Sequence, residues 1–179
     1  AVGEEQVVNT NTNDNFDPAV AQLPGTDGDF IVVYTSVGTD GAANGVFAQR
    51  FDKNGNKLNR DGTGLASGDS DEFQINTTTV QDQFEPQIAA FSDGSWVVVW
   101  TDDTLDGNGS GVVFQRFNSD GTPAGTETVT NNLPAGSQDR PDISALDNAG
   151  FVVAWVSSRT ACGGGGGGST PTTTPTTAS

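Results

Sequence analysis

One short pattern occurs three times along the chain and constrains the fold more than any other feature of the sequence. In each copy, a segment that begins with proline is followed by a run of aromatic and β-branched residues. The copies occupy residues 18–34, 86–100 and 141–155. Repetition of this kind is typical of one small supersecondary unit that has been copied and stacked. A single unit cannot bury its apolar face alone, so we expect the copies to share a core.

Further pieces repeat in register with this pattern. The sequence Gln-Arg-Phe follows the first two aromatic runs, at residues 49–51 and 115–117, and an Asn-Gly or Asp-Gly turn comes after each. Short segments rich in Asn and Thr, at residues 6–10, 74–77 and 129–131, precede the proline segments. Apolar runs bounded by such turns are typical of β-strands. Each unit is therefore predicted to form four short antiparallel strands, as in a β-propeller blade.

The sequence predicts an all-β protein of about two and a half four-stranded, blade-like antiparallel repeats, with a β-sandwich as the alternative. Residues 1–160 are assigned to this repeat body. Residues 161–179 contain a run of glycines and a stretch rich in Thr and Pro, which predicts a joint and a disordered or extended tail. The aromatic residues expected in the buried layer are Phe30, Tyr34, Trp96, Trp100, Phe151 and Trp155.

The composition narrows the range of partners. The chain has 7 Lys and Arg residues, 23 Asp and Glu residues and no His, which gives a formal net charge of -16. Nucleic acid is excluded as a partner because phosphate binding needs a basic face. No apolar run approaches the ~20 residues that span a bilayer, so direct membrane insertion is not expected. Few Lys residues, with abundant Thr, Asn, Asp and Gly, predict a secreted protein that is extracellular or at the cell surface.

One oxygen-rich loop is the candidate metal site. It contains Asp102, Asp103, Asp106 and Asn108, with glycines between them. Ca²⁺ takes roughly six to eight oxygen ligands from loops of this kind, and an acidic surface attracts divalent cations. The sequence therefore predicts a Ca²⁺ site here, with a solvated hairpin loop as the alternative.

Two kinds of glycosylation site are predicted. Asn76 and Asn108 each begin an Asn-x-Ser/Thr motif, although Asn76 also occupies a repeated position, which favours a structural role as the alternative. The tail has the composition of an O-glycosylated stalk. Its candidate threonines are Thr170, Thr172, Thr173, Thr174, Thr176 and Thr177.

The sequence offers little for catalysis. Without His, the most common general base is missing, and no nucleophile motif or phosphate-binding loop is present. Adjacent carboxylates such as Asp102 and Asp103 could take part in glycosidase chemistry, but exposed pairs of this kind are common. The arginines of the Gln-Arg-Phe segments are expected to be structural, paired with carboxylates such as Asp17 and Glu85. The chain is therefore predicted not to be an enzyme.

The repeat resembles a known group of proteins. The pattern Asp-Gly-x-aromatic-Val-Val-x-Trp, followed by Gly-Val-x-x-Gln-Arg-Phe and by Phe-Gln-Ile-Asn-Thr, is similar to repeats of very large secreted bacterial surface proteins and calcium-associated adhesins. The resemblance covers residues 5–158 and implies blade-like β modules. The tail resembles those of chains that polymerise into glycosylated extracellular filaments.

These observations predict a structural extracellular protein, a protomer of a secreted filament or surface adhesin. Its partners would be covalent glycans and further copies of itself, joined head to tail by exchange of a β-strand. The alternative is a tethered carbohydrate-binding or calcium-dependent adhesive module, and a third hypothesis is a fragment of a secreted glycan-active enzyme. The predicted donor strand consists of Gln6, Val7, Val8 and Asn9.

Overall fold

A computed structural model describes most of the chain. The described residues are 5–41, 43–65, 72–104, 109–130, 136–147 and 150–158, together with the backbone of residues 169–176. Within these ranges the regular structure consists of strands, so the all-β prediction is confirmed. No helix in the described part of the chain has the length and apolar character needed to cross a bilayer.

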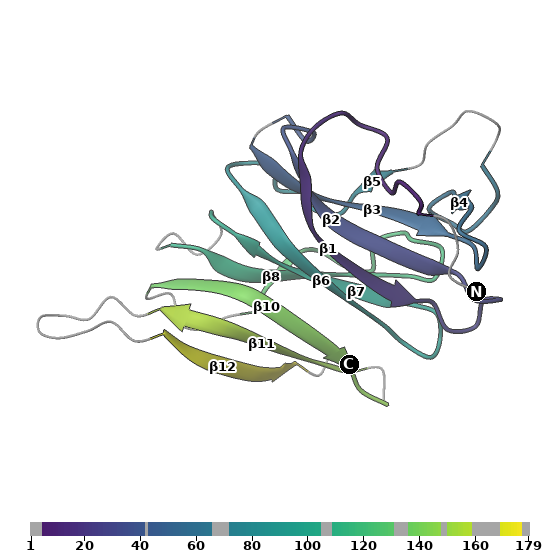
Figure 1. Cartoon of the computed structure of the whole chain (residues 1–179). Coiled ribbons are helices and arrows are strands. Elements are labelled where there is room, and N and C mark those ends of the chain that lie inside the picture. The colour runs from purple at the N-terminus through teal and green to yellow at the C-terminus, as the bar shows by residue number, and fades with distance from the viewer. Residues whose placement is uncertain are drawn as a thin grey trace, which may run out of the picture.

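The strands form three antiparallel sheets that follow one another along the chain (Figure 1). The first sheet has the order β1 (Asn15–Gln22), β2 (Phe30–Val37), β3 (Asn44–Phe51) and β4 (Lys57–Leu58), with β5 (Phe73–Gln74) also paired to β3. The second has the order β6 (Gln83–Ala90), β7 (Trp96–Asp102), β8 (Gly111–Phe117) and β9 (Thr128–Val129). The third has the order β10 (Ser137–Ala145), β11 (Phe151–Ser158) and β12 (Ser169–Thr176). Each sheet thus begins with a proline strand and continues with an aromatic strand, as the repeat predicts.

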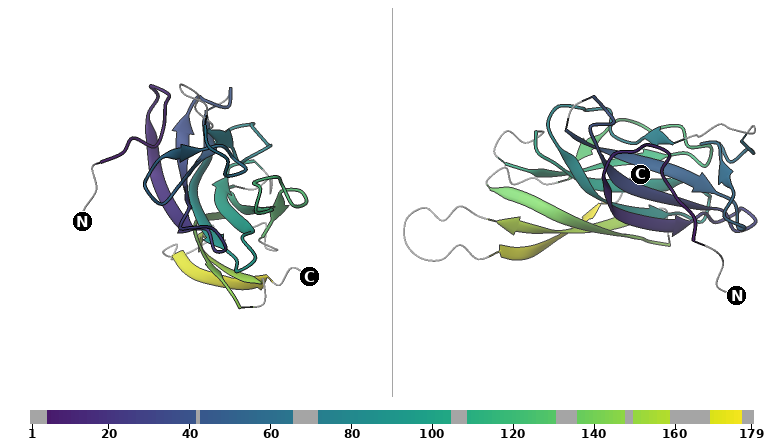
Figure 2. Two further views of the ribbon diagram at one scale, coloured as in Figure 1. Left: turned by 90° about the vertical axis from the view of Figure 1, so that its right-hand side faces the viewer. Right: turned by 45° about the horizontal axis from the view of Figure 1, so that its top comes forward.

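The second sheet lies between the other two (Figure 2). On β7, Trp96, Val98 and Trp100 belong to the core shared with the first sheet. The alternate residues Val97 and Val99 belong to the core shared with the third sheet. This alternation explains why the run is apolar at every position, because both faces of the strand are covered.

The predicted buried layer is largely confirmed. Five of its six aromatic residues are buried, and Phe30 is half-buried. Burying a large apolar side chain contributes about 1.5–3 kcal/mol. The repeated aromatic runs therefore stabilise the stack of sheets. The five buried residues are Tyr34, Trp96, Trp100, Phe151 and Trp155.

The first strands of the three sheets, β1, β6 and β10, lie next to one another, and we call them the inner strands (Figure 1). Each inner strand has a β-bulge where its proline occurs. The residue before each proline has a positive φ: 51° at Asp17, 55° at Glu85 and 53° at Arg140. Non-glycine residues rarely adopt this conformation, and bulges re-aim side chains. The repeat therefore turns three polar side chains in a non-standard direction at equivalent places.

The Asn/Thr-rich segments complete the sheet of the unit that precedes them. β5 pairs with β3, and β9 pairs with β8, in each case as an outer strand. The equivalent segment at residues 6–9 is not in a strand and lies over the first sheet instead. The segment has no preceding sheet among the described residues to pair with.

The tail is extended over residues 169–176, as predicted, and forms β12. This strand pairs with β11 in the place that β3 and β8 occupy in the other sheets. Pro171 lies opposite Val156, and Pro175 lies opposite Val152. Backbone N–H groups point to alternate sides along a strand, so both prolines lack the N–H on the same side of β12. Because proline is tolerated where the N–H would face away from the partner strand, that side is the outer edge of the sheet.

Candidate functional site

The three bulges of the inner strands meet at one pocket. Asp17 of β1, Glu85 of β6 and Arg140 of β10 all line it, and we call these three residues the inner-strand site. The pocket has a volume of about 310 Å³. Backbone strain of this kind is typical of functional sites, because the surrounding structure must maintain it. The remaining lining residues are Pro18, Gln87 and Pro141.

Hydrogen bonds connect each inner strand to the next through this site. The carboxylate of Asp17 accepts a hydrogen bond from the backbone N–H of Glu85. Oε2 of Glu85 in turn accepts one from the backbone N–H of Arg140 at 2.8 Å. The same oxygen accepts a second from Oγ1 of Thr101 at 3.1 Å. These contacts fix the carboxylates relative to one another and to the three backbones.

Two aspartates at or beside this site have a raised pKa. Burial and the negative charge of Glu85 raise the pKa of Asp17, against the opposing effect of the hydrogen bond from the Glu85 backbone. Burial also raises the pKa of Asp139, where the guanidinium of Arg140 opposes the shift and Glu85 adds to it. Nε of Arg140 lies 3.8 Å from Oδ1 of Asp139. An acid with a perturbed pKa that lines a pocket, as Asp17 does, is typical of sites that transfer protons.

The arrangement can therefore perform acid–base chemistry without histidine. A carboxyl group with a raised pKa keeps its proton to a higher pH than an ordinary one, and a neighbouring carboxylate can accept a proton. Glycoside hydrolysis requires just such a pair of carboxyl groups. Asp17 and Glu85 provide the pair, and Arg140 and Gln87 add hydrogen-bond donors at the same pocket.

The predicted metal loop is only partly described, since Asp106 and Asn108 lie outside the described residues. Asp102 is buried, and its Oδ1 accepts hydrogen bonds from the backbone N–H of Thr104 at 2.8 Å and from Oγ1 of Thr104 at 2.6 Å. Burial and the charges of Asp82 and Asp102 raise the pKa of Asp103. The described ranges contain no group of three or more His, Cys, Asp or Glu residues arranged to hold a metal ion. Calcium binding at this loop stays a prediction.

The geometry of Asn76 matches the structural alternative. Asn76 is only 3% exposed, and its Oδ1 accepts a hydrogen bond from the backbone N–H of Val46 at 2.8 Å. Its Nδ2, which would carry an N-linked glycan, donates to Oε1 of Gln83 at 3.0 Å and to the carbonyl of Thr78 at 2.8 Å. These contacts tie the end of the first unit to the second, and glycosylation of Asn76 stays a prediction.

The other glycosylation predictions concern the tail and one loop residue. Asn108 and Thr177 lie outside the described residues. O-glycosylation of the remaining threonines, which lie in β12, stays a prediction. These threonines are Thr170, Thr172, Thr173, Thr174 and Thr176.

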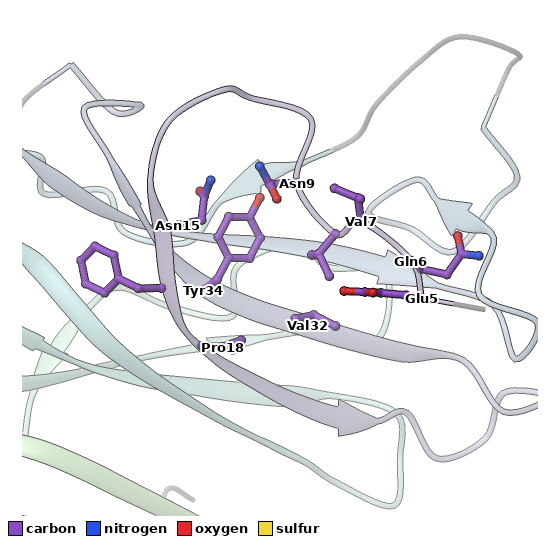
Figure 3. Close-up of a pocket in the computed structure, with 10 residues that line it drawn as sticks. Glu5, Gln6, Val7, Asn9, Asn15, Pro18, Val32 and Tyr34 are labelled. Carbon is purple, nitrogen blue, oxygen red and sulfur yellow. The ribbon is translucent and has the colours of Figure 1, made fainter. Parts of the chain in front are cut away.

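The predicted donor strand lines a second pocket, of about 300 Å³, against β1 and β2. In Figure 3 the N-terminal segment passes over Pro18, Val32 and Tyr34. The hydroxyl of Tyr34 donates to Oε2 of Glu72 at 2.8 Å, and burial together with this contact raises its pKa. Association of copies through the donor residues stays a prediction. The four residues, Gln6, Val7, Val8 and Asn9, contact their own chain here.

Arg50, from the first Gln-Arg-Phe segment, pairs with a carboxylate as predicted, but the carboxylate is that of Asp29. Arg50 donates to Oδ2 of Asp29 at 2.9 Å and to the carbonyl of Ser119 at 3.1 Å. The guanidinium of Arg116 lies over the ring of Phe91, 4.8 Å from its centre. The predicted pairing with Asp17 and Glu85 is wrong because the arginines lie near the hairpin turns, at the opposite end of the sheets from the bulges.

Comparison with known proteins informs the fold. No protein-family model and no curated protein matches the sequence. Among solved structures, the fold is similar to that of the endo-arabinase from Bacteroides thetaiotaomicron, with a TM-score of 0.57 and 12% sequence identity. The match covers 97% of this chain and 60% of that chain, so the protein described here spans less than two thirds of its length. At this identity the likeness shows the fold.

This likeness contradicts two predictions from the sequence. The prediction of a structural filament protomer and the prediction that the chain is not an enzyme are both contradicted, because the similar fold belongs to an endo-arabinase. The prediction had relied on the absence of His, but carboxyl groups can also serve as general acid and base. Asp17 and Glu85 were missed as a pair because they belong to different repeats. The signal that identifies them is the polar residue before each repeated proline.

Proposed function

We propose that this chain carries a glycoside hydrolase site formed by the inner strands. The observation that carries the proposal is the convergence of Asp17 and Glu85, from separate sheets, on one open pocket. The bulges that place them there occur at equivalent positions of the repeat. The similarity of the fold to an endo-arabinase supports a polysaccharide as the substrate. Such a substrate agrees with the secreted location that the composition predicts.

The two carboxyl groups have different roles in this proposal. Asp17, whose pKa is raised, donates its proton to the oxygen of the leaving sugar as the general acid. Glu85 acts from the other side, either by taking a proton from the attacking water or by attacking the sugar carbon itself. Arg140 and Gln87 bind sugar hydroxyls, since both carry donors and line the pocket. No histidine or metal is needed for these steps.

The proposal is tested by measuring new reducing ends released from arabinan and from a panel of other neutral polysaccharides. Asp17→Asn keeps the shape of the side chain but removes the proton donor, so we expect the rate to fall by about 10²–10⁴-fold. Asp142→Asn is the matched control, because Asp142 is an exposed acid on the same inner strand as Arg140. Its rate should equal that of the unaltered chain. Absence of activity on every polysaccharide, or full activity of Asp17→Asn, would overturn the proposal.

A further inference from the structure

The position directly after each aromatic run differs among the three sheets in an informative way. It is occupied by Thr35 in the first sheet, Thr101 in the second and Val156 in the third. In each sheet this residue pairs with the residue just before the bulge of the inner strand. The three positions therefore stand in the same relation to the inner-strand site, and their side chains can be compared directly.

The hydroxyl at this position accompanies a carboxylate at the bulge. Thr101 lies on β7, which pairs with the strand β6 that carries Glu85, and Oγ1 of Thr101 donates to Oε2 of Glu85 at 3.1 Å. Where the bulge carries Arg140, the equivalent residue is Val156. Arginine has only donors, so a hydroxyl there would have no acceptor at the bulge side chain. The pattern indicates that the role of the threonine is to donate a hydrogen bond to the carboxyl group at the bulge.

The first sheet has both members of the pair, but they are not joined. Thr35 is fully buried, and its Oγ1 has no hydrogen-bond partner among the described residues. Asp17 instead accepts the backbone N–H of Glu85. A buried hydroxyl without a partner is costly, so it is normally retained only for a reason. The second sheet shows what its partner would be, namely the carboxyl group at the neighbouring bulge.

We propose that Thr35 is a positioning residue for Asp17, whose carboxyl group alternates between the backbone N–H of Glu85 and the hydroxyl of Thr35. This inference rests on the proposed function for its catalytic meaning. When Asp17 has given its proton to the leaving sugar, it becomes a carboxylate beside Glu85 in a partly buried site. The Thr35 hydroxyl then donates to it and stabilises the new charge. Arg140, on the third inner strand, is the cation that lines the same pocket.

The first test is a pH titration of Asp17 in the full chain. NMR of ¹³C-labelled aspartate monitors the side-chain carboxyl carbon. Thr35→Val removes the hydroxyl and keeps the shape, so the titration midpoint of Asp17 should rise because the charged form loses a donor. Thr35→Ser keeps the hydroxyl and should restore the original midpoint.

The second test is kinetic and uses the same variants with the polysaccharide identified for the unaltered chain. We expect Thr35→Val to lower kcat by about tenfold with little change in KM, which is the effect of losing one hydrogen bond in the transition state. Thr35→Ser should recover kcat. An unchanged Asp17 midpoint in Thr35→Val would overturn the inference, as would failure of serine to rescue it. If the midpoint responds but the unaltered chain hydrolyses no glycan, the positioning role stands and the proposed function fails.

Discussion

Aspartates at the two ends of the sheets are held in opposite ways. The strand β6 shows the two ends. Its bulge, at Glu85, lies near the start of the strand, and the turn that contains Asp93 follows its other end. Near the bulges, burial raises the pKa of Asp17 and of Asp139. At the turns, hydrogen bonds from Ser95 and Thr122 lower the pKa of Asp93 and of Asp120. The charged form of aspartate is thus disfavoured at the bulge end of the sheets and favoured at the turn end.

The difference separates acids that hold the fold from acids available for chemistry. A turn aspartate accepts the backbone N–H and the hydroxyl of the residue two positions later, as Asp93 does from Ser95 at 2.9 and 2.6 Å. Such contacts fix a hairpin and favour the charged form. An acid in a pocket without a comparable set of donors keeps its proton more readily. We therefore expect substitutions at the bulge end to affect mainly activity and substitutions at the turn end to affect mainly stability.

The largest expected effect is on activity at the bulge end. Glu85→Gln should lower the rate of polysaccharide hydrolysis by about 10²–10⁴-fold, because an amide can neither take a proton from water nor attack the sugar. Asp120→Asn, at the turn end, should leave the rate unchanged. Measuring both rates under identical conditions checks the comparison. Equal losses in the two variants would contradict it.

The next effect is on stability at the turn end. Arg50 is buried and bonded to Asp29 and to the carbonyl of Ser119, so Arg50→Ala leaves an unpaired carboxylate and a bare carbonyl. Removal of one partner from such a pair costs about 3–5 kcal/mol. The side chain of Arg140 is 73% exposed. Arg140→Ala should therefore lower the free energy of unfolding by less than about 1 kcal/mol. Denaturant unfolding of the two variants measures the difference in the free energy of unfolding. Similar losses of stability would contradict the separation between a stabilising turn end and a catalytic bulge end.

A smaller effect concerns pH and the bulge end. The folded chain keeps the proton of Asp17 to a higher pH than the unfolded chain, whose Asp titrates near 3.8. Stability is therefore lost as pH rises from 3.8 through the raised pKa, and the loss is complete above it. Asp17→Asn removes this penalty and should be more stable than the unaltered chain at pH 7. The advantage should shrink as the pH falls towards 3.8, as thermal unfolding at several pH values would show.

The smallest effect has the opposite sign and belongs to the turn end. The lowered pKa of Asp93 means that its contribution is present above 3.8 and lost as pH falls through the lowered value. Asp93→Ala should reduce stability at pH 7 by less than about 1 kcal/mol, because the site is exposed to solvent. Asp93→Asn retains an acceptor and should lose less. A penalty for Ala that does not shrink as the pH falls below 3.8 would mean that the contact is not electrostatic.

Much of the fold follows from the sequence. The repeated aromatic runs predicted about two and a half similar units that share a core, and they predicted most of the aromatic residues that are buried. These are local patterns, because alternation along a strand reports its own burial. The tail was predicted to be extended, but its pairing with β11 was not, since Thr and Pro carry no apolar pattern that marks a sheet.

The candidate site was harder to predict. Its residues are Asp17, Glu85 and Arg140, which differ from one another and therefore escape a search for identical repeats. Their proximity depends on how the sheets pack, which brings the inner strands together. Residues 6–9 are not in a strand, whereas the equivalent segments pair with the third strand of a preceding sheet. Strand exchange through residues 6–9 stays a prediction.

The two prolines of β12 have a consequence for the behaviour of the protein at high concentration. An exposed strand edge is a template on which other chains can add strands and aggregate. On β12, two of the positions that would donate to an incoming strand have no hydrogen to give. A strand added there would bury carbonyl and amide groups of its own that lack partners, which is costly. The edge strand β12 therefore disfavours the addition of a strand from another chain to the third sheet, and this reduces aggregation at that edge.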